Sequence, residues 1–471
     1  MANDGEERLY TQADVDRMIA PLLDRIAQLE AKIVRLTRDS RTSSKPPSSD
    51  VVKPKSPGPR GKKRKPGGQK GHPKNERELF PAEQLDEAYE YELTDTTGLR
   101  PLTGDDGWRI VQRIELVDKP YRVVEHRARR YMKVSTGRIV TASLPVDARR
   151  GGLLGPKLTG LIAYLKGPCH LSYRSIELYF DEVMGLKLSV GVLAKAVAKA
   201  TEALAEPYEE LLAVLPRQPV LGIDETGHRH RGQGCWTWCL HAPPVPNDEG
   251  LTCFVIDPSR GSNVVKELIG EDYAGIILCD FFSAYRKCLA DMPDLVVQFC
   301  WAHLVRDIKF LAEHPDPVIR RYGLKVLAPV RKLFELLARR DTMTAAGYRR
   351  SAERLRRAIR HAIRHTPDRL ECWNLAERFR KHGDSYFTFI DYDDVSGVDP
   401  TNNRTEQKIR FVVIDRKVTQ GTKGEVGWQW CQRIWSTIAT CRQRGISVYR
   451  FLLDAIAAHL NNRTTPSLIS A

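Results

Sequence analysis

Hydrophobic residues recur with a helical repeat near the start of the chain. They fall at intervals of four and three residues with charged residues between them: Val15, Ile19, Leu22, Ile26, Leu29, Ile33 and Leu36. This a/d heptad pattern predicts a coiled-coil helix within residues 8–40. Pro21 falls inside the pattern and should kink the helix or start it afresh. The same seam would also suit packing on another part of this chain, so that alternative stays open.

The pattern beyond residue 80 favours strands. β-branched and aromatic residues are frequent in 108–117 and 121–126, and Ser135, Thr136 and Gly137 form a turn signal before another short strand. We therefore expect a small β-rich module over residues 80–150.

From 151 to 216 the hydrophobic spacing is helical. Ser172 and Ser189 are credible helix N-caps, and Gly185 lies between the two helices that they would begin. A helix-turn-helix would present lysines on or near its DNA-recognition helix. The candidates are Lys187, Lys195 and Lys199. Two amphipathic helices joined by a glycine are also common in ordinary helical domains, so this pattern alone does not establish DNA binding.

Strand patterns dominate after Pro219. In order, they predict strands at 219–224, 235–241 and 251–256, a helix at 263–269, a strand at 275–280, a helix at 283–289 and a strand at 295–300. Three antiparallel strands followed by alternating helix and strand is the order of a ribonuclease-H-like α/β domain.

These patterns together predict a multidomain α+β protein. Its ribonuclease-H-like catalytic domain carries a helical insertion and follows a coiled coil, a small β module and a helix-turn-helix region. The expected boundaries are 8–40 coiled coil, 41–79 disordered basic arm, 80–150 β module, 151–216 helix-turn-helix region, 217–300 first part of the catalytic core, 301–395 arginine-rich helical insertion, 396–426 segment with the catalytic Glu, and 427–471 C-terminal helices.

Three acidic residues stand where the predicted elements would bring them together. Asp224 and Asp280 each close an apolar run of strand type, and Glu406 lies near the start of a predicted helix. A carboxylate at the end of a buried strand is costly to desolvate unless a cation or hydrogen-bond donors meet it. The pattern therefore indicates a divalent-metal site suited to phosphodiester chemistry. Asp224 would be a ligand of both ions, and Asp280 and Glu406 would each complete the coordination of one ion.

Other interpretations of these acids remain open. Asn403 and Glu406 have the spacing of a helix capping box, and Glu406 with Arg410 forms an i, i+4 pair. Glu225 should point to the opposite sheet face from Asp224, and Asp257 follows a strand that need not border the site. Both are weaker candidates.

His303 is a further candidate for the site. It ends the motif Cys300-Trp301-Ala302-His303 just after the last predicted strand, where it would contact a phosphate or position a water. One C-x-x-H is at most half a zinc site. A packed core position explains the motif equally.

The chain has 74 Lys and Arg against 59 Asp and Glu, a formal charge of +15. Residues 51–75 contain nine basic residues and no acid, interleaved with Pro and Gly. Such a segment cannot bury apolar surface, but its cations can displace counterions from DNA phosphates. The principal candidates are Arg60, Lys62, Lys63, Arg64 and Lys65. A basic but merely solvated linker is the alternative.

A second basic run follows Glu406. It comprises Arg410, Arg416, Lys417 and Lys423, and it would suit the holding of DNA strands beside the acids. A solvated helix face accounts for it as well.

The cysteines and the hydropathy indicate the compartment. All ten cysteines lie at or after Cys169 without a C-x-x-C pair, as expected in a reducing environment. No stretch approaches the roughly 20 apolar residues of a membrane span, and the polar N-terminus lacks a signal-peptide core. We expect a cytoplasmic protein.

The ordered motifs of the chain resemble those of the insertion-sequence-66 family of bacterial transposases. The resemblance rests on Asp224-Glu225-Thr226, Ser259-Arg260-Gly261, Asp280 with Tyr285, Cys300-Trp301-Ala302-His303, the run from Asn402 to Arg410 with Arg416-Lys417, and Thr440-Cys441-Arg442. Ser43-Ser44-Lys45-Pro46-Pro47 and Pro66-Gly67-Gly68-Gln69 agree with the family at the front of the chain.

The resemblance implies a DDE transposase. Asp224, Asp280 and Glu406 would hold two Mg²⁺ ions, with Mn²⁺ as a substitute, and Arg260 would be one of the DNA contacts. The enzyme would bind terminal inverted repeats, hydrolyse one strand at each transposon end and use the freed 3′ hydroxyl to attack target DNA. Coupling two ends favours a homodimer or higher oligomer, and accessory transposition proteins are potential partners. No membrane partner is expected.

Two departures from the family pattern are visible. The family's module after the basic arm resembles a cysteine zinc finger, whereas residues 76–150 contain no cysteine, so no zinc is expected. Phe281 and Phe282 follow Asp280 where the family usually has a smaller, Gly-containing turn. Two rival functions remain at this point: a structure-specific nuclease on the same fold, and a DNA-binding regulator with a silent catalytic domain.

Overall fold

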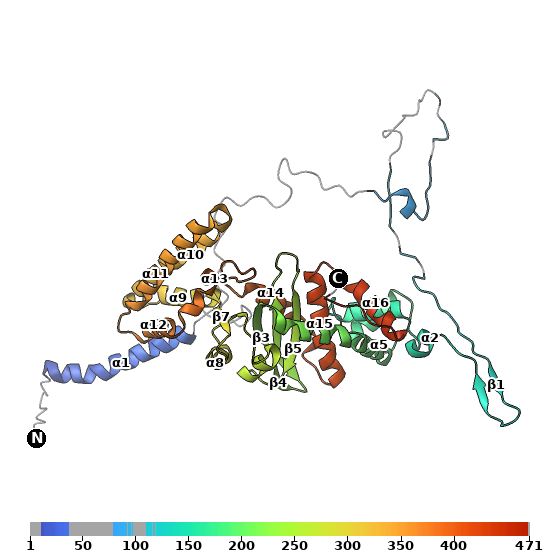
Figure 1. Cartoon of the computed structure of the whole chain (residues 1–471), viewed down its shortest axis with the longest axis horizontal. Helices are drawn as coiled ribbons and strands as arrows, with labels where there is room; N and C mark the ends of the chain where they lie inside the picture. The colour runs from blue at the N-terminus through green and yellow to red at the C-terminus, as the bar shows by residue number, and fades with distance from the viewer. Residues whose placement is uncertain are drawn as a thin grey trace, which may run out of the picture. The chain divides into compact units, whose positions relative to one another are not determined.

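The computed structural model describes residues 11–36, 79–91, 93–95, 97, 110–114, 116–117 and 119–469 (Figure 1). The chain divides into two units. Residues 55–125 form one, and residues 1–54 with 126–471 form the other. The sequence-predicted basic arm lies outside the described residues.

A five-stranded mixed sheet is the centre of the larger unit. Its strands are β3 (Val220–His230), β4 (Gln233–Ala242), β5 (Leu251–Asp257), β6 (Ile276–Cys279) and β7 (Val296–Phe299). The spatial order is β5-β4-β3-β6-β7. The first three strands in sequence are antiparallel, and β6 and β7 add in parallel beside β3.

All five predicted strands are therefore present, with shifted ends. The largest shift is in β3, which was expected to end at Asp224 but continues to His230 and pairs with β4 throughout. Strand β6 lies between two parallel neighbours and is buried along its whole length. Such burial on both faces explains the unbroken apolar run of its sequence.

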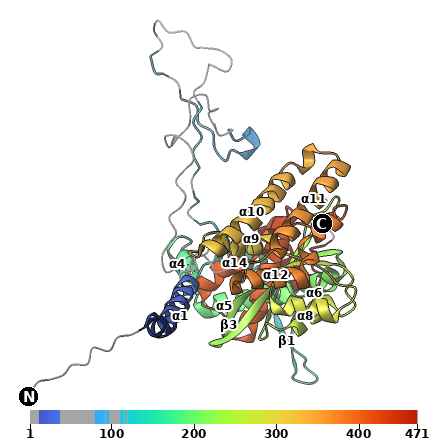
Figure 2. The same ribbon diagram turned by 90° about the vertical axis from the view of Figure 1, so that its left-hand side faces the viewer.

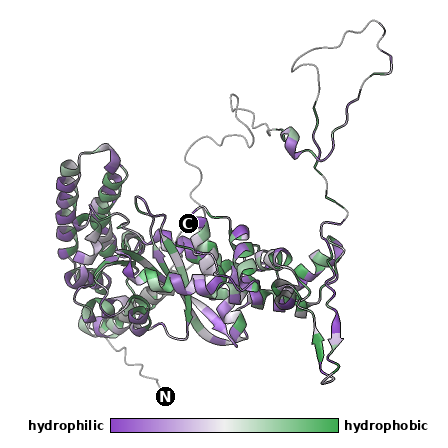
Figure 3. Ribbon diagram, turned by 45° about the vertical axis from the view of Figure 1, so that its right-hand side comes forward, coloured by the Kyte–Doolittle hydropathy of each residue, from purple (hydrophilic) through white to green (hydrophobic). Residues whose placement is uncertain are grey.

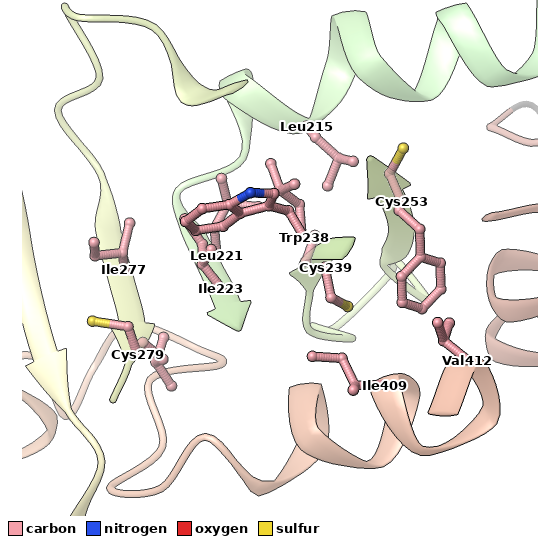
Figure 4. Close-up of a cluster of buried hydrophobic side chains, with 14 of the residues drawn as sticks. Leu215, Leu221, Ile223, Trp238, Cys239, Cys253, Ile277, Cys279, Ile409 and Val412 are labelled. Atoms are coloured by element: carbon pink, nitrogen blue, oxygen red, sulfur yellow. The ribbon is translucent and has the colours of Figure 1, made fainter. Parts of the chain in front are cut away.

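The sheet is covered by helices from distant parts of the chain. Figure 4 shows Ile409 and Val412 of α14 (Asn403–Thr419) on one side of the strands and Leu215 on the other, with Trp238 between. All four side chains belong to one buried hydrophobic cluster. The core thus joins segments nearly two hundred residues apart in sequence.

Helix α15 (Glu425–Gln443) protects the outer edge of the sheet. The N–H groups of Thr252 and Phe254 on β5 donate to the hydroxyls of Thr440 and Ser436 on this helix. Side-chain hydroxyls thereby satisfy backbone donors that an edge strand would otherwise expose.

The segment before the sheet is helical, as predicted. It contains α2 (Val146–Gly151), α3 (Pro156–Lys166), α4 (Tyr173–Glu182), α5 (Val190–Ala203) and α6 (Ala205–Val214). The N-caps predicted for two of these helices are confirmed. Ser172 accepts a hydrogen bond from the N–H of Ser175, and Ser189 accepts one from Val192. Helix α16 (Val448–Leu460) packs on α3 and α5.

Another group of helices lies between β7 and α14. It contains α9 (Trp301–Ala312), α10 (Pro317–Leu337), α11 (Ala345–Arg364), α12 (Leu370–His382) and α13 (Thr388–Asp391). Helices α10 and α11 pack side by side (Figure 2). Both are amphipathic: buried residues recur mainly at spacings of three, four or seven positions, and both hydrophilic and hydrophobic residues are seen along the pair (Figure 3).

The chain leaves the sheet for these helices and returns to it at one place. The N–H of Trp301 donates to the carbonyl of Pro400, and the N–H of Asn402 donates to the Sγ of Cys300. Cys300 and Asn402, which flank the helical segment, are therefore adjacent.

The β-rich module is smaller than expected. In the described part of 80–150, the strands are β1 (Arg130–Met132) and β2 (Ile139–Thr141), which pair antiparallel and are exposed. The described residues of 110–126 form no strand. Ile110, Val111 and Val123 are exposed, so their β-branched side chains have no core to join, and a lone two-stranded ribbon gains little stability.

Helix α1 (Gln12–Leu36) is continuous through Pro21, so the proline neither restarts nor ends it. Ile19, Leu22, Ile26 and Leu29 of the heptad seam are exposed. In the second unit, the described residues include a 3₁₀ turn at Ala82–Gln84. Among the helices of the described residues, none is long and apolar enough to cross a membrane.

Candidate active site

The two predicted aspartates lie on neighbouring parallel strands. The register pairs Val220 with Ile276 and Gly222 with Leu278. Asp224 lies two residues beyond the last pair, and Asp280 follows β6 directly. The carboxyl ends of adjacent parallel strands meet at one sheet edge, where open α/β sheets commonly bind ligands.

Helix α14 brings Glu406 to the same edge. Its first turn lies against β3, where the side-chain amide of Asn402 donates to the carbonyl of Ile223 at 2.9 Å. Gly222 permits this approach, because a Cβ there would overlap Thr405 Oγ1. The capping-box alternative for Glu406 is not observed. The N-cap is Asn402 rather than Asn403, and its side chain makes no cap hydrogen bond.

The acids influence one another electrostatically. Burial raises the pKa of Asp224 well above its ordinary value, and the charges of Glu225, Asp280 and Glu406 raise it further. Burial and the charge of Glu225 raise the pKa of Asp280 to about 6, against the opposing effect of a hydrogen bond from the N–H of Phe282. The surroundings of Asp224 and Asp280 therefore disfavour the ionised form of these two carboxyl groups in the absence of a cation.

His303 on α9 also reaches this cluster. Its Nε2 lies 3.5 Å from Glu406 Oε1. Burial lowers the pKa of His303 to about 4, with Arg306 and Arg378 lowering it further, so the imidazole is neutral at pH 7. Its Nδ1 is buried and has no hydrogen-bond partner within the part of the chain that the structure describes.

A buried network beside the aspartates was not predicted from the sequence. The side chain of Glu225 is 1% exposed. Its Oε1 accepts from Arg260 Nε at 2.9 Å and Nη2 at 2.6 Å, and its Oε2 accepts from the hydroxyl of Tyr285 at 2.5 Å. The opposite-face placement expected for Glu225 had marked it as a weak candidate. The signal that could have revealed it was the joint presence of Arg260 and Tyr285 among the family motifs.

Arg260, which was predicted to contact DNA, forms an ion pair with Glu225. Its guanidinium also lies over two aromatic rings, with its central carbon 4.4 Å from the Trp236 centroid and 3.8 Å from that of Phe282. Phe282 belongs to the turn after Asp280, so Arg260 links that turn to the residue next to Asp224.

The acids fit a divalent metal in donor type and charge. Carboxylate oxygens are the ligands that Mg²⁺ prefers, and burial, together with the neighbouring carboxylates, raises the pKa of Asp224 and of Asp280, an effect that a bound cation would oppose. As the side chains stand, no three His, Cys, Asp or Glu side chains among the described residues converge closely enough to hold an ion. Asp257, the weaker candidate, caps its own loop by accepting from the N–H of Ser259.

The predicted DNA contacts occupy different surroundings. Lys195 on α5, and Arg410 and Lys417 on α14, are exposed. Arg416 is half-buried and donates from Nη1 to Thr226 Oγ1 at 3.2 Å. Residues 60–65 lie outside the described part of the chain.

Comparison with family models identifies the class of protein to which this fold and these acids belong. Residues 151–429 match the model described as Transposase IS66 family. The chain is therefore a member of the IS66 family of transposases, as its motifs indicated. A second model, for a family of unknown function, matches residues 6–78. No curated protein matches the chain.

Proposed function

We propose that the chain is the DNA transposase of an insertion sequence, with Asp224, Asp280 and Glu406 as its catalytic acids. One observation carries the proposal: Asp224 on β3 and Asp280 directly after β6 lie at the carboxyl ends of adjacent parallel strands, and the hydrogen bond from Asn402 to Ile223 holds the first turn of α14, with Glu406, against the same strand. The sheet order β5-β4-β3-β6-β7 supports a ribonuclease-H-like catalytic core.

In this proposal the three acids hold two Mg²⁺ ions, for which Mn²⁺ would substitute. The bound ions would activate the attacking oxygen and stabilise the leaving oxygen of a phosphodiester. In the first step water attacks phosphorus and the bond to the 3′ oxygen breaks, which leaves a 3′ hydroxyl. In the second step that hydroxyl attacks phosphorus in a target phosphodiester and forms a new bond to it, while the bond to the target's 3′ oxygen breaks. No covalent enzyme intermediate is needed.

The protein's own residues orient this chemistry. His303 is neutral at pH 7, so a hydrogen on its Nε2 would point to Glu406 Oε1 and restrain that carboxylate. Glu225 is held by Arg260 and Tyr285, so it supports the backbone next to Asp224 rather than entering the reaction. The buried surroundings of Asp224 and Asp280 strengthen every charge interaction at the site.

DNA binding is assigned to three places. The basic segment 51–75 would neutralise phosphates, helices α4 and α5 would form a helix-turn-helix with Lys195 on its second helix, and Arg410 and Lys417 would hold strands beside the acids. The exposed heptad seam of α1 supports pairing with a second copy. Two copies would bring two transposon ends together.

The testing experiment measures cleavage and joining of labelled DNA that carries the sequences flanking this gene. The native chain is compared with Asp280→Asn in Mg²⁺ and in Ca²⁺. We expect Mg²⁺-dependent nicking and joined product from the native chain, and neither from Asp280→Asn, although the variant keeps its DNA affinity. Asp272→Asn, a change at an exposed acid of the same unit, is the matched control and should retain both products.

Each other outcome points to a different function. Nicking without joining would replace the transposase with a structure-specific nuclease. Binding without either product would indicate a DNA-binding regulator. Cleavage retained by Asp280→Asn would overturn the assignment of the catalytic acids.

A further inference from the structure

Beyond the catalytic acids, the β6-side edge of β3 is met by residues at the two ends of α14 rather than by a strand. Strand β6 pairs with β3 only as far as Gly222, whereas β3 runs on to His230. The carbonyls of Ile223 and Arg229 both face this edge, since they accept from Asn402 Nδ2 and from the N–H of Thr422. By the two-residue repeat of a strand, the backbone of Gly227 faces the edge as well.

A groove of about 640 Å³ is lined in part by this end of β3. Its volume is within the range of about 300–1,000 Å³ usual for ligand sites. The lining residues come from the β3–β4 hairpin and from the end of α14: Gly227, His228, Arg229, Gly234, Cys235, Trp236, Arg416 and Gln420. Two of them are arginines and none is acidic, so the groove favours an anion.

Arg416 is the main cation of the groove. Its guanidinium is half-buried, and its hydrogen bond to Thr226 Oγ1 at 3.2 Å is to a neutral group. Burial lowers the pKa of Arg416, with no carboxylate opposing that shift. A partly desolvated guanidinium without an acid is well suited to a phosphate, which its donors can bind bidentately.

The groove also offers a planar contact for a base. Trp236 lines it and is covered by Arg260 on one side, at 4.4 Å. The two glycines leave the strand backbone open to close approach, since an added Cβ on Gly227 would meet only Arg416 Nη1, at 3.8 Å.

We propose that this groove binds an unpaired nucleotide of the DNA strand that passes the catalytic acids, with its phosphate on Arg416 and its base against Trp236. The inference rests on the proposed function. Gly227 is three residues along the same strand from Asp224, about 10 Å at the rise of a β-strand. Base stacking requires a free base face, so an unpaired nucleotide fits the groove and a paired one does not.

The test is photocrosslinking of the full chain to a short single-stranded oligonucleotide that contains 5-iodouracil, in EDTA so that no cleavage occurs. The crosslinked peptides are mapped by mass spectrometry. We expect crosslinks within residues 227–236. Arg416→Gln removes the phosphate contact, and Gly227→Val places a side chain in the groove. Each should lower the crosslink yield by about tenfold, the size expected for loss of one stacked base.

The matched control is Arg380→Gln, which removes an exposed arginine from α12 with the same change of charge. Its crosslink yield should equal that of the native chain. Circular dichroism melts establish that each variant is folded. If Gly227→Val does not fold, Arg416→Gln alone tests the proposal.

Two results would overturn the proposal: crosslinks that map elsewhere, or a yield at residues 227–236 that neither groove variant lowers. Equal crosslinking to the same oligonucleotide in a duplex would refute the unpaired state of the nucleotide. Cleavage assays separate this inference from the function on which it rests. Mg²⁺-dependent nicking without groove crosslinks would refute the groove alone, whereas groove crosslinks without nicking would refute the catalytic assignment alone.

Discussion

Arg260 donates two hydrogen bonds to one oxygen of Glu225, from Nε at 2.9 Å and from Nη2 at 2.6 Å. The same guanidinium lies between the rings of Trp236 and Phe282. The two candidate aspartates are therefore connected through a neighbour of each, since Glu225 follows Asp224 and Phe282 belongs to the turn that Asp280 begins.

Removal of this arginine should destabilise the fold. In Arg260→Ala the carboxylate of Glu225 stays buried with no cation beside it, and uncompensated buried charges of this kind cost about 3–5 kcal/mol. Because the Arg260 side chain is 36% exposed, water can replace part of its interaction with Glu225. We therefore expect a loss of stability at the lower end of that range. Urea unfolding measures the loss. Arg380→Ala breaks an exposed pair with Glu377 and should cost less than about 1 kcal/mol. Equal losses for the two variants would show that the Arg260–Glu225 ion pair stabilises the fold no more than an exposed ion pair does.

The raised pKa of Asp280 should make stability depend on pH. Its folded value of about 6 lies above the ordinary 3.8, so between these values the native state binds more protons than the unfolded chain. The free energy of unfolding therefore falls as the pH rises through this window, by about 3 kcal/mol for a shift of this size. Asp280→Asn removes the titrating group and should be more stable than the native chain at neutral pH.

Urea unfolding of the native chain and of Asp280→Asn, each at about pH 4.5 and about pH 7.5, isolates this effect because the other titrating groups are common to both proteins. Asp272→Asn serves as the control and should follow the native chain at both values. A stability difference between native and Asp280→Asn that is the same at both pH values would contradict the prediction.

Gly222 should be intolerant of a side chain. An added Cβ would overlap Thr405 Oγ1 and lie 3.0 Å from Asn402 Oδ1, so Gly222→Ala should push the first turn of α14, with Glu406, away from β3. Overpacking of this kind costs about 1–3 kcal/mol. The double variant Gly222→Ala/Thr405→Ala removes the overlapping hydroxyl and should recover part of both stability and Mg²⁺-dependent cleavage. A double variant no better than Gly222→Ala would show that the close approach does not position α14.

The basic segment should determine how DNA binding responds to salt. Deletion of residues 51–75 removes nine cations, so the slope of log affinity against log salt should flatten by several units, at about 0.9 per phosphate neutralised. A chain of full length in which those nine residues are Gln separates charge from length and should behave like the deletion. An unchanged slope would make the segment a linker.

The strands could be predicted from the sequence because their apolar runs are short and bounded by turn residues. The neighbouring placement of Asp224 and Asp280 followed from strand order alone. The continuation of β3 to His230 could not be predicted, because Thr226 to His230 are polar and are stabilised by β4 and by Thr422 from a distant loop. The Glu225 network and the bond from Asn402 to Ile223 likewise join segments whose proximity no local pattern encodes.

In the described part of residues 80–150 fewer strands are present than the sequence favoured. Its β-branched residues have the local preference for strands, but the described part of that region lacks a buried face, and local preference alone does not build a sheet.

The meeting of Cys300 and Asn402 has a consequence for how such proteins can diverge. Because the chain departs from the sheet after β7, and Thr388 and Phe389 hydrogen-bond back to β7, the helices between these points behave as one long loop whose ends are fixed by the core. The entropy of closing a loop grows only slowly with its length, so this excursion can lengthen, shorten or be exchanged between relatives at small thermodynamic cost. His303 lies in the first turn of α9 and contacts Glu406. An exchanged segment must therefore begin after that turn if the contact is to be kept.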